Sequence, residues 1–233
     1  MSPRNFYGRM IGLDEAKPFI EAHHYSGSVP TGPNIFFGAF LDGDLYAVAA
    51  YGSGANMNLE PWLAELTGLP VACGNLTILK RLCRKGEKDD ALDQRSRSRG
   101  EIPMTQFLSF CHRALREFFG IRYIMAYSDP AAGHNGGIYR AANFIHLGTT
   151  KSEQHVQDAD GRIMHRRGVY HYRRRCGVET TAEVRDMLGL SLIMTPPKDR
   201  WFIDLSGEWP WPWLRPVLRS ANVVKTRKTT GVT

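Results

Sequence analysis

The sequence has few cysteines, no long apolar run and no apolar stretch at its N-terminus. Its 4 cysteines are far apart in 233 residues and form no CxxC pair, which argues against a disulfide framework or a cysteine-rich zinc site. No apolar run approaches the ~18 residues of a membrane span, and residues 1–5 lack the apolar core of a signal peptide. We therefore expect a cytoplasmic protein with reduced cysteines that does not enter a membrane.

The composition is that of a folded protein. Apolar residues make up 42% and charged residues 23%, which excludes a disordered chain. The net charge of +7 is unevenly spread: residues 1–161 carry 16 Lys and Arg against 17 Asp and Glu, whereas residues 162–233 carry 14 against 6. A basic segment of this kind most often binds nucleic acid; the alternative is a solvated basic surface.

Apolar periodicity and turn residues predict an α/β protein in which strands and helices alternate. This order favours a mixed sheet flanked by helices. We expect a catalytic domain over residues 1–175 and a basic extension over 176–233 that packs on it and is flexible from about residue 225. The expected strands span 5–13, 35–41, 45–51, 76–83, 123–127, 144–149 and 168–172, and the expected helices 14–22, 62–66, 104–119, 136–143 and 181–188.

The strongest local signal follows the expected strand at 123–127. The strand ends in Ser128 and Asp129, a glycine-rich loop follows, and a helix carrying Tyr139 then begins. The carboxyl ends of strands in α/β sheets face the ligand crevice, so a carboxylate and a phenol could share a pocket here. The alternative is an ordinary turn in which Asp129 caps a helix.

Two adjacent histidines, His23 and His24, end the first expected helix. Neighbouring residues point in different directions on a helix, so a metal site for iron would need a further ligand, for which His134 is a candidate. The alternative is a cationic helix end that is stabilised by the helix dipole.

A cation lies within the expected strand at 76–83. Strand alternation places Arg81 and Cys83 on one face. A cation on the inner face of a strand needs an anionic partner, either a substrate or a buried carboxylate such as Asp129.

The last third of the chain joins arginines to aromatic residues. Tyr170 and Tyr172 lie among the arginines, which suits phosphate contact together with base stacking. The Trp-Pro alternation at 209–213 could add a stacking surface, or could be a loop pinned by tryptophan burial. The residues expected to contact phosphate are Arg166, Arg167, Arg173, Arg174 and Arg175.

Six short motifs occur in the order found in the Mom DNA-modification proteins of Mu-like phages, and the chain resembles that family over about residues 10–175. The motifs are His-His-Tyr-Ser-Gly at 23–27, Leu-x-Arg-Leu at 79–82, Phe-Leu-Ser at 107–109, Tyr-Ser-Asp-Pro at 127–130, Gly-His-x-Gly at 133–136 and Ile-Tyr-Arg-Ala-Ala-Asn-Phe at 138–144.

The resemblance implies a GNAT-like fold and conversion of adenine in double-stranded DNA to its carbamoylmethyl form, which shields phage DNA from restriction in the host cytoplasm. The target adenine is expected to be flipped out of the duplex. By position, the family's functional residues fall on Tyr25, Arg81, Asp129 and Tyr139. The other polar residues of the motifs are expected to bind substrate or donor: His24, Ser26, Ser109, Ser128 and His134.

The acyl donor stays open at this point. Residues 95–101 stand where a GNAT protein carries its pyrophosphate loop but lack the required glycine spacing, so ordinary acetyl-CoA binding is not expected from them. The added group has the atoms of a glycyl group, which favours an activated glycyl donor such as glycyl-tRNA. The alternatives are acetyl-CoA, an iron-dependent enzyme, a generic GNAT acyltransferase and a DNA-binding protein without activity; a homodimer also stays open.

Overall fold

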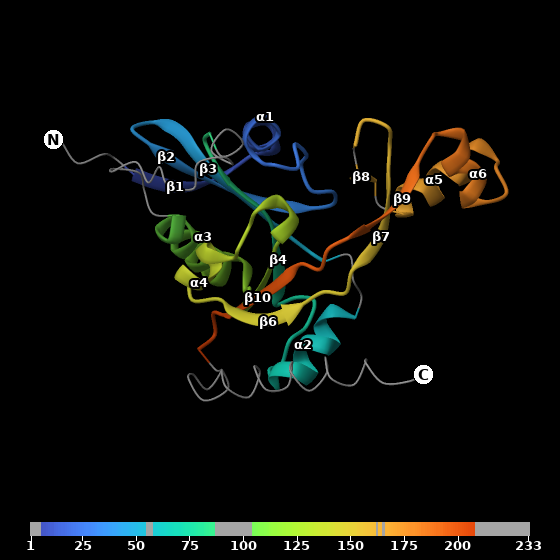
Figure 1. Ribbon diagram of the computed structural model, residues 1–233. Helices are drawn as coiled ribbons and strands as arrows, with labels where there is room; N and C mark the ends of the chain where they lie inside the picture. Colours follow the sequence, from blue (N-terminus) through green and yellow to red (C-terminus); the bar gives the residue numbers. More distant parts are fainter. Residues whose placement is uncertain (1–5, 55–57, 87–103, 162, 165, 208–233) are drawn as a thin grey trace. The chain divides into compact units, whose positions relative to one another are not determined.

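The computed structural model describes residues 6–54, 58–86, 104–161, 163–164 and 166–207. Seven of the strands form one mixed sheet in the order β1-β2-β3-β4-β5-β10-β6 (Figure 1). Only β4 and β5 are parallel among the described pairs of this sheet. The strands are β1 (Phe6–Ile11), β2 (Asn34–Leu41), β3 (Asp44–Gly52), β4 (Leu76–Arg84), β5 (Tyr123–Ser128), β6 (Ile145–Thr149) and β10 (Asp199–Asp204).

Helices cover both faces of this sheet, so the predicted mixed sheet flanked by helices is confirmed. One face packs against α1 (Leu13–His23) and α2 (Leu59–Thr67), and the other against α3 (Met104–Phe119) and α4 (Gly137–Ala141). None of the described helices is long and apolar enough to cross a membrane.

Local sequence explains these elements. Phe107, Leu108, Cys111 and Leu115 recur at helical spacing and are all buried, which makes α3 amphipathic over the predicted bounds. The β2–β3 hairpin turns through residues 42 and 43, both at positive φ, as the Asp-Gly pair predicts.

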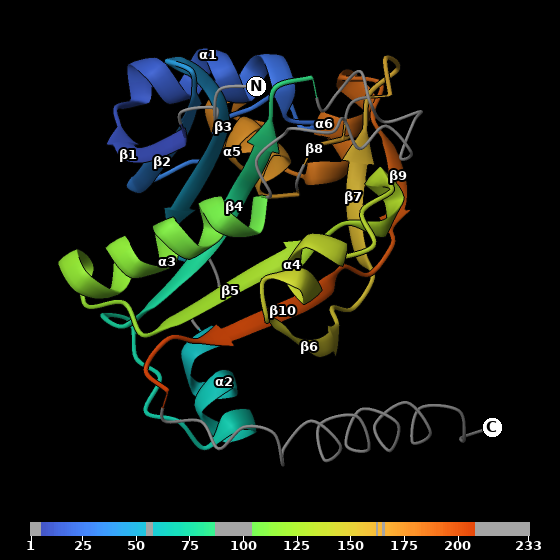
Figure 2. The ribbon, with the colours of Figure 1, turned by 90° about the vertical axis from the view of Figure 1, so that its left-hand side faces the viewer.

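The strands β4 and β5 diverge because β4 carries a bulge. The register between β4 and β3 shifts by one residue at Lys80, and a bulge bends its strand. β4 pairs with β5 only up to Leu79, opposite Ala126, although β4 continues to Arg84. Beyond that point the end of β5 pairs with β10 alone among the described strands, as the views of Figures 1 and 2 agree.

A second compact unit, residues 149–198, is inserted between β6 and β10. Its core is formed by Val156, Val169 and Val184. A three-stranded antiparallel sheet, in the order β8-β7-β9, accompanies two helices. The elements are β7 (Glu153–Gln157), β8 (Ile163–Met164), α5 (Arg166–Cys176), α6 (Thr181–Met187) and β9 (Ser191–Thr195).

The strand predicted at 168–172 is wrong, because these residues lie inside α5. The run Val-Tyr-His-Tyr has high β propensity, but packing of Val169 into the core of the inserted unit overrides it. The chain divides into compact units at residues 148 and 198. Residue 175, the expected end of the catalytic domain, lies near the end of α5. Pairing of β10 with β5 returns the chain to the first unit, and no local pattern reveals this.

Candidate functional site

The loop that follows α1 is fastened to β4 beside the bulge. Arg81 donates from Nε to the carbonyl oxygen of Ser28 at 3.0 Å, and Lys80 donates from Nζ to that of Thr31 at 3.2 Å. These bonds join residues about 50 positions apart in sequence and place the His-His-Tyr-Ser-Gly motif next to the divergence of β4 and β5.

A buried histidine sets the shape of this loop. His24 is buried, and its Nδ1 accepts the backbone N–H of Ser26 at 3.1 Å. The hydroxyl of Ser26 lies 2.9 Å from the same nitrogen. Nδ1 is therefore an acceptor, which puts the proton of the neutral imidazole on Nε2. The intervening Tyr25 is directed outward and is 45% exposed.

The loop that follows β5 meets Tyr25. The carbonyl oxygen of Asp129 accepts the backbone N–H groups of Ala132 at 3.0 Å and His134 at 3.1 Å, which closes the loop. The rings of Tyr25 and His134 then contact edge to face, with centroids 4.8 Å apart. Burial lowers the pKa of His134 and the nearby Asp129 opposes this, so the imidazole is neutral at pH 7.

Arg81 extends this group from the β4 side. As expected, it lies on the same face of β4 as Cys83, and both Cys83 and Tyr25 are within electrostatic reach of its guanidinium. Burial lowers the pKa of Arg81, but an arginine stays charged at pH 7. Within the described chain its hydrogen bonds go to the carbonyl oxygens of Ser28 and Lys80.

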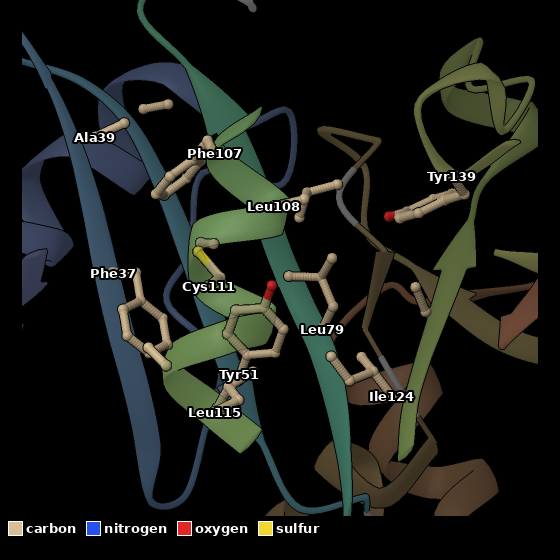
Figure 3. Packing of buried hydrophobic residues seen from close by; sticks show 14 of the residues in the cluster. Phe37, Ala39, Tyr51, Leu79, Phe107, Leu108, Cys111, Leu115, Ile124 and Tyr139 are labelled. Atoms are coloured by element: carbon tan, nitrogen blue, oxygen red, sulfur yellow. The ribbon is translucent and has the colours of Figure 1, made fainter. Parts of the chain in front are cut away.

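Tyr139 lies on the α3 and α4 face of the sheet. Its ring is buried, stacks on Trp201 at 5.8 Å and meets Phe144 edge to face. In Figure 3 the hydroxyl points away from α4, toward the side of Leu79 and Leu108. Leu79 is the last residue of β4 that pairs with β5, so the phenol is directed to the place where the strands part. Tyr25 thus lies between His134 and Arg81, and Asp129 acts electrostatically on His134. Tyr139 lies on the face of the sheet that packs against α3 and α4.

Ser109 lies apart from that group. It lines a pocket of about 350 Å³ between α3, the end of α4 and β10, together with Arg113, Arg116, Asn143 and the buried His112. None of the residues that line this pocket belongs to the group around His134. Its cations and hydroxyl suit a polar, anionic ligand.

His112 should make the stability of the protein depend on pH. Burial lowers its pKa to about 4, from an ordinary value of 6.5. The unfolded chain therefore binds the proton more tightly, and stability falls as the pH drops from 6.5 to 4, by about 3 kcal/mol in total. Because Nε2 is buried and has no hydrogen-bond partner among the described residues, we expect His112→Leu to be as stable as the parent at pH 7.5. Urea unfolding of both proteins between pH 4 and 7.5 measures the free energy of unfolding. If it depends on pH in the same way in both proteins, His112 does not cause the loss of stability.

The metal candidates do not form a metal site. The described residues contain no group of three His, Cys, Asp or Glu side chains able to hold an ion. His23 Nδ1 accepts the backbone N–H of Gly86, and His24 Nδ1 is engaged by Ser26. The residues described do not fit an iron centre built from His23, His24 and His134.

The arginines of the basic helix α5 have two kinds of surroundings. Arg173 donates to the carbonyl oxygen of Glu179 at 2.9 Å and lies over the ring of Tyr170 at 5.0 Å, so it stabilises the inserted unit. Arg174 and Arg175 are exposed. The side chains of Arg166 and Arg167, and the segments 95–101 and 209–213, lie outside the described residues.

Sequence reasoning missed Asp199, Trp201 and His146, which surround Ser128. Ser128 is buried and bonds both Trp201 and Asp199. Asp199 in turn bonds His146. No local signal could have found these residues, because they lie on two strands, β10 and β6, that meet β5 and each other only in the folded sheet.

Solved structures with similar folds include several acyl-group transferases. An N-acetyltransferase from Staphylococcus aureus Mu50 is 10% identical with a TM-score of 0.44, and the match covers 87% of this chain and 99% of that one. An N-acyl amino acid synthase from uncultured soil microbes is 13% identical with a TM-score of 0.47, covering 92% and 97%. No curated protein matches the chain.

The sequence also matches a model of a protein family over most of its length. The architecture is a mixed sheet flanked by helices, as the resemblance implies. The match to the family model spans residues 5–190 and so includes every motif described above. The chain belongs to the Mom protein family.

Proposed function

We propose that this protein is a transferase that converts adenine in DNA to its carbamoylmethyl form at the exocyclic amine. The observation that carries this proposal is the family match over residues 5–190. The contact of Tyr25 with His134, together with Arg81 beside Tyr25 and Asp129 beside His134, supports it. The modification would protect phage DNA from restriction enzymes.

The atoms of the product favour a glycyl donor. The added group is CH₂–CO–NH₂, whereas acetyl transfer would leave CO–CH₃. We propose that the adenine amine first attacks an activated glycyl ester, such as glycyl-tRNA, and expels the alcohol. The new free amine then attacks the purine carbon that bears the amide, through a five-membered ring. Cleavage of the bond between that carbon and the original nitrogen gives ring–NH–CH₂–CO–NH₂, with no redox step.

The side chains of the site suit these steps. The adenine amine is a weak nucleophile because its lone pair is delocalised, so we assign Asp129 as its general base. Tyr139 would donate a proton or hold the acyl oxygen. Arg81 has five N–H donors and gives two hydrogen bonds to carbonyls in the described chain, which leaves donors for a developing oxyanion. The exposed ring of Tyr25 would hold the flipped adenine.

The inserted unit would hold the nucleic acid. Arg174→Ala combined with Arg175→Ala should weaken binding of a DNA duplex and flatten the plot of log K against log salt by about 1.8, since each lost phosphate contact removes about 0.9. Arg173→Ala is the matched control, because that side chain bonds Glu179 within the unit. Fluorescence anisotropy at several salt concentrations measures the affinity and its salt dependence. Equal slopes for the double variant and the parent would show that Arg174 and Arg175 do not contact phosphate.

The product provides the direct test of the function. Nucleosides from the DNA of cells that express the protein should contain a deoxyadenosine heavier by C₂H₃NO, as measured by mass spectrometry. DNA from cells that express Asp129→Asn is the control. If the DNA contains only unmodified deoxyadenosine although the protein is folded and well expressed, the proposed function is wrong.

Isotope labelling distinguishes the donors. Glycine labelled at both carbons and the nitrogen should shift the modified base by two carbons and one nitrogen. Glycine labelled only at nitrogen should label the nitrogen bound to the purine ring, because the rearrangement exchanges the two nitrogens. Label in the terminal amide, or carbons from acetate without glycine label, would reject glycyl transfer and leave the product assignment intact.

A further inference from the structure

Four side chains around the end of β5 form a directed chain of hydrogen bonds. Trp201 Nε1 lies 2.9 Å from Ser128 Oγ, which lies 3.2 Å from Asp199 Oδ2. The other carboxylate oxygen of Asp199 lies 3.0 Å from His146 Nε2. We call these four residues the β10 clamp, since β10 contributes Asp199 and Trp201.

The chemistry of the groups fixes the direction of each bond. An indole N–H can only donate, so Ser128 Oγ accepts from Trp201 and gives its own proton to Asp199. An ionised carboxylate can only accept, so His146 carries a proton on Nε2. Asp199 therefore receives one donor on each oxygen, one from β5 and one from β6.

The end of β5 depends on this clamp because of the bulge in β4. Beyond Ala126, β5 pairs only with β10 among the described strands, and its last pair joins Ser128 to Asp199. Asp129 follows immediately. At the other end of the same loop, Gly136 packs against the ring of Trp201, where an added Cβ would overlap the ring. β10 thus holds the loop over residues 129–136 at both ends.

We propose that Asp199 is a positioning residue that fixes Ser128, and through it the Asp129 loop, in the geometry that the reaction needs. The catalytic part of this inference rests on the proposed function. Asp199 acts through hydrogen bonds and moves no proton to or from the substrate. His146 completes the set of donors to its carboxylate.

Two substitutions at one position separate positioning from proton transfer. Asp199→Ala removes both acceptors, and a displacement of the order of 1 Å in a catalytic group costs about 10²-fold, so kcat should fall about 10²-fold while KM changes little. Asp199→Asn can still accept from Ser128 and can donate to Nε2 once His146 takes its other neutral tautomer. It should therefore stay within about threefold of the parent.

Amide hydrogen exchange provides a readout that does not depend on activity. The backbone N–H groups of Ala132 and His134 donate to the carbonyl of Asp129 and report on the loop. Their exchange should become at least tenfold faster in Asp199→Ala and remain unchanged in Asp199→Asn. Asp204→Ala is the matched control at the far end of β10, where that carboxylate accepts from Ser206.

The outcomes decide the inference. Equal losses of kcat in Asp199→Asn and Asp199→Ala would show that the charge, and not the hydrogen bonding, matters, and would overturn it. Unchanged exchange of the loop in Asp199→Ala would overturn it as well. If Asp199→Ala does not fold, Ser128→Ala removes the same bond from the other side and should give the same faster exchange. If the parent protein makes no modified adenine, the proposed function fails while the exchange measurements still test the clamp.

Discussion

Asp129→Asn should lower DNA modification by roughly 10²-fold or more, because the substitution keeps the shape of the side chain and removes its ability to take a proton. The loop bonds from Ala132 and His134 reach the backbone carbonyl of residue 129, so the variant retains them. The rate of carbamoylmethyladenine formation, measured by mass spectrometry with purified protein, reports the effect.

The matched control for this variant is Asp44→Asn, which removes an exposed carboxylate at the start of β3. It should modify DNA at the rate of the parent. Binding of a DNA duplex should be similar in all three proteins, since Asp129 is assigned to the chemical step. If Asp129→Asn modifies DNA at nearly the rate of the parent, Asp129 is not the general base and serves only to form the turn.

Gly136→Ala should destabilise the protein by roughly 3 kcal/mol, which lowers the melting temperature by about 6–12 °C. Two causes add. The residue has φ +69°, a conformation that costs a residue with a Cβ about 1–2 kcal/mol, and the new methyl group would overlap the six-membered ring of Trp201. Thermal unfolding followed by circular dichroism measures the sum.

Gly133→Ala separates the two causes. Gly133 lies in the same loop with φ +78°, but no atom of the described part of the chain lies within 4 Å of an added Cβ. It should therefore cost only the backbone strain, about 1 kcal/mol. In a Trp201→Phe background the benzo ring is gone, and Gly136→Ala should cost no more than Gly133→Ala. If Gly136→Ala and Gly133→Ala lower the free energy of unfolding equally in the parent background, the loop moves away from Trp201 without an energetic penalty.

Short-range sequence patterns were sufficient to predict many of the helices and strands of the first unit. The bounds of α3 follow from apolar residues at helical spacing, and the β2–β3 hairpin follows from Asp42 and Gly43 between two β-rich runs. These features depend on residues that are neighbours in sequence, so tertiary packing did not need to be known. The run Val-Tyr-His-Tyr in α5 shows the limit, because a core contact of Val169 decided its conformation against its β propensity.

The candidate site could be predicted only in part from the sequence. The motif order nominates Tyr25, Arg81, Asp129 and Tyr139, but no spacing indicates that Tyr25 contacts His134. That contact requires the loop after α1 to be fastened by Lys80 and Arg81, which the bulge in β4 brings into position.

The sequence by itself determined the α/β class, the helical face of α3, the family motifs and the basic character of the last third. Only the tertiary structure decided that residues 149–198 form an inserted unit and that β10 returns to pair with β5. It alone placed Asp199 on Ser128, 71 residues away. The physical reason is that periodicity records which side of an element is apolar, whereas strand pairing and hydrogen bonds between distant residues depend on how complete elements pack together.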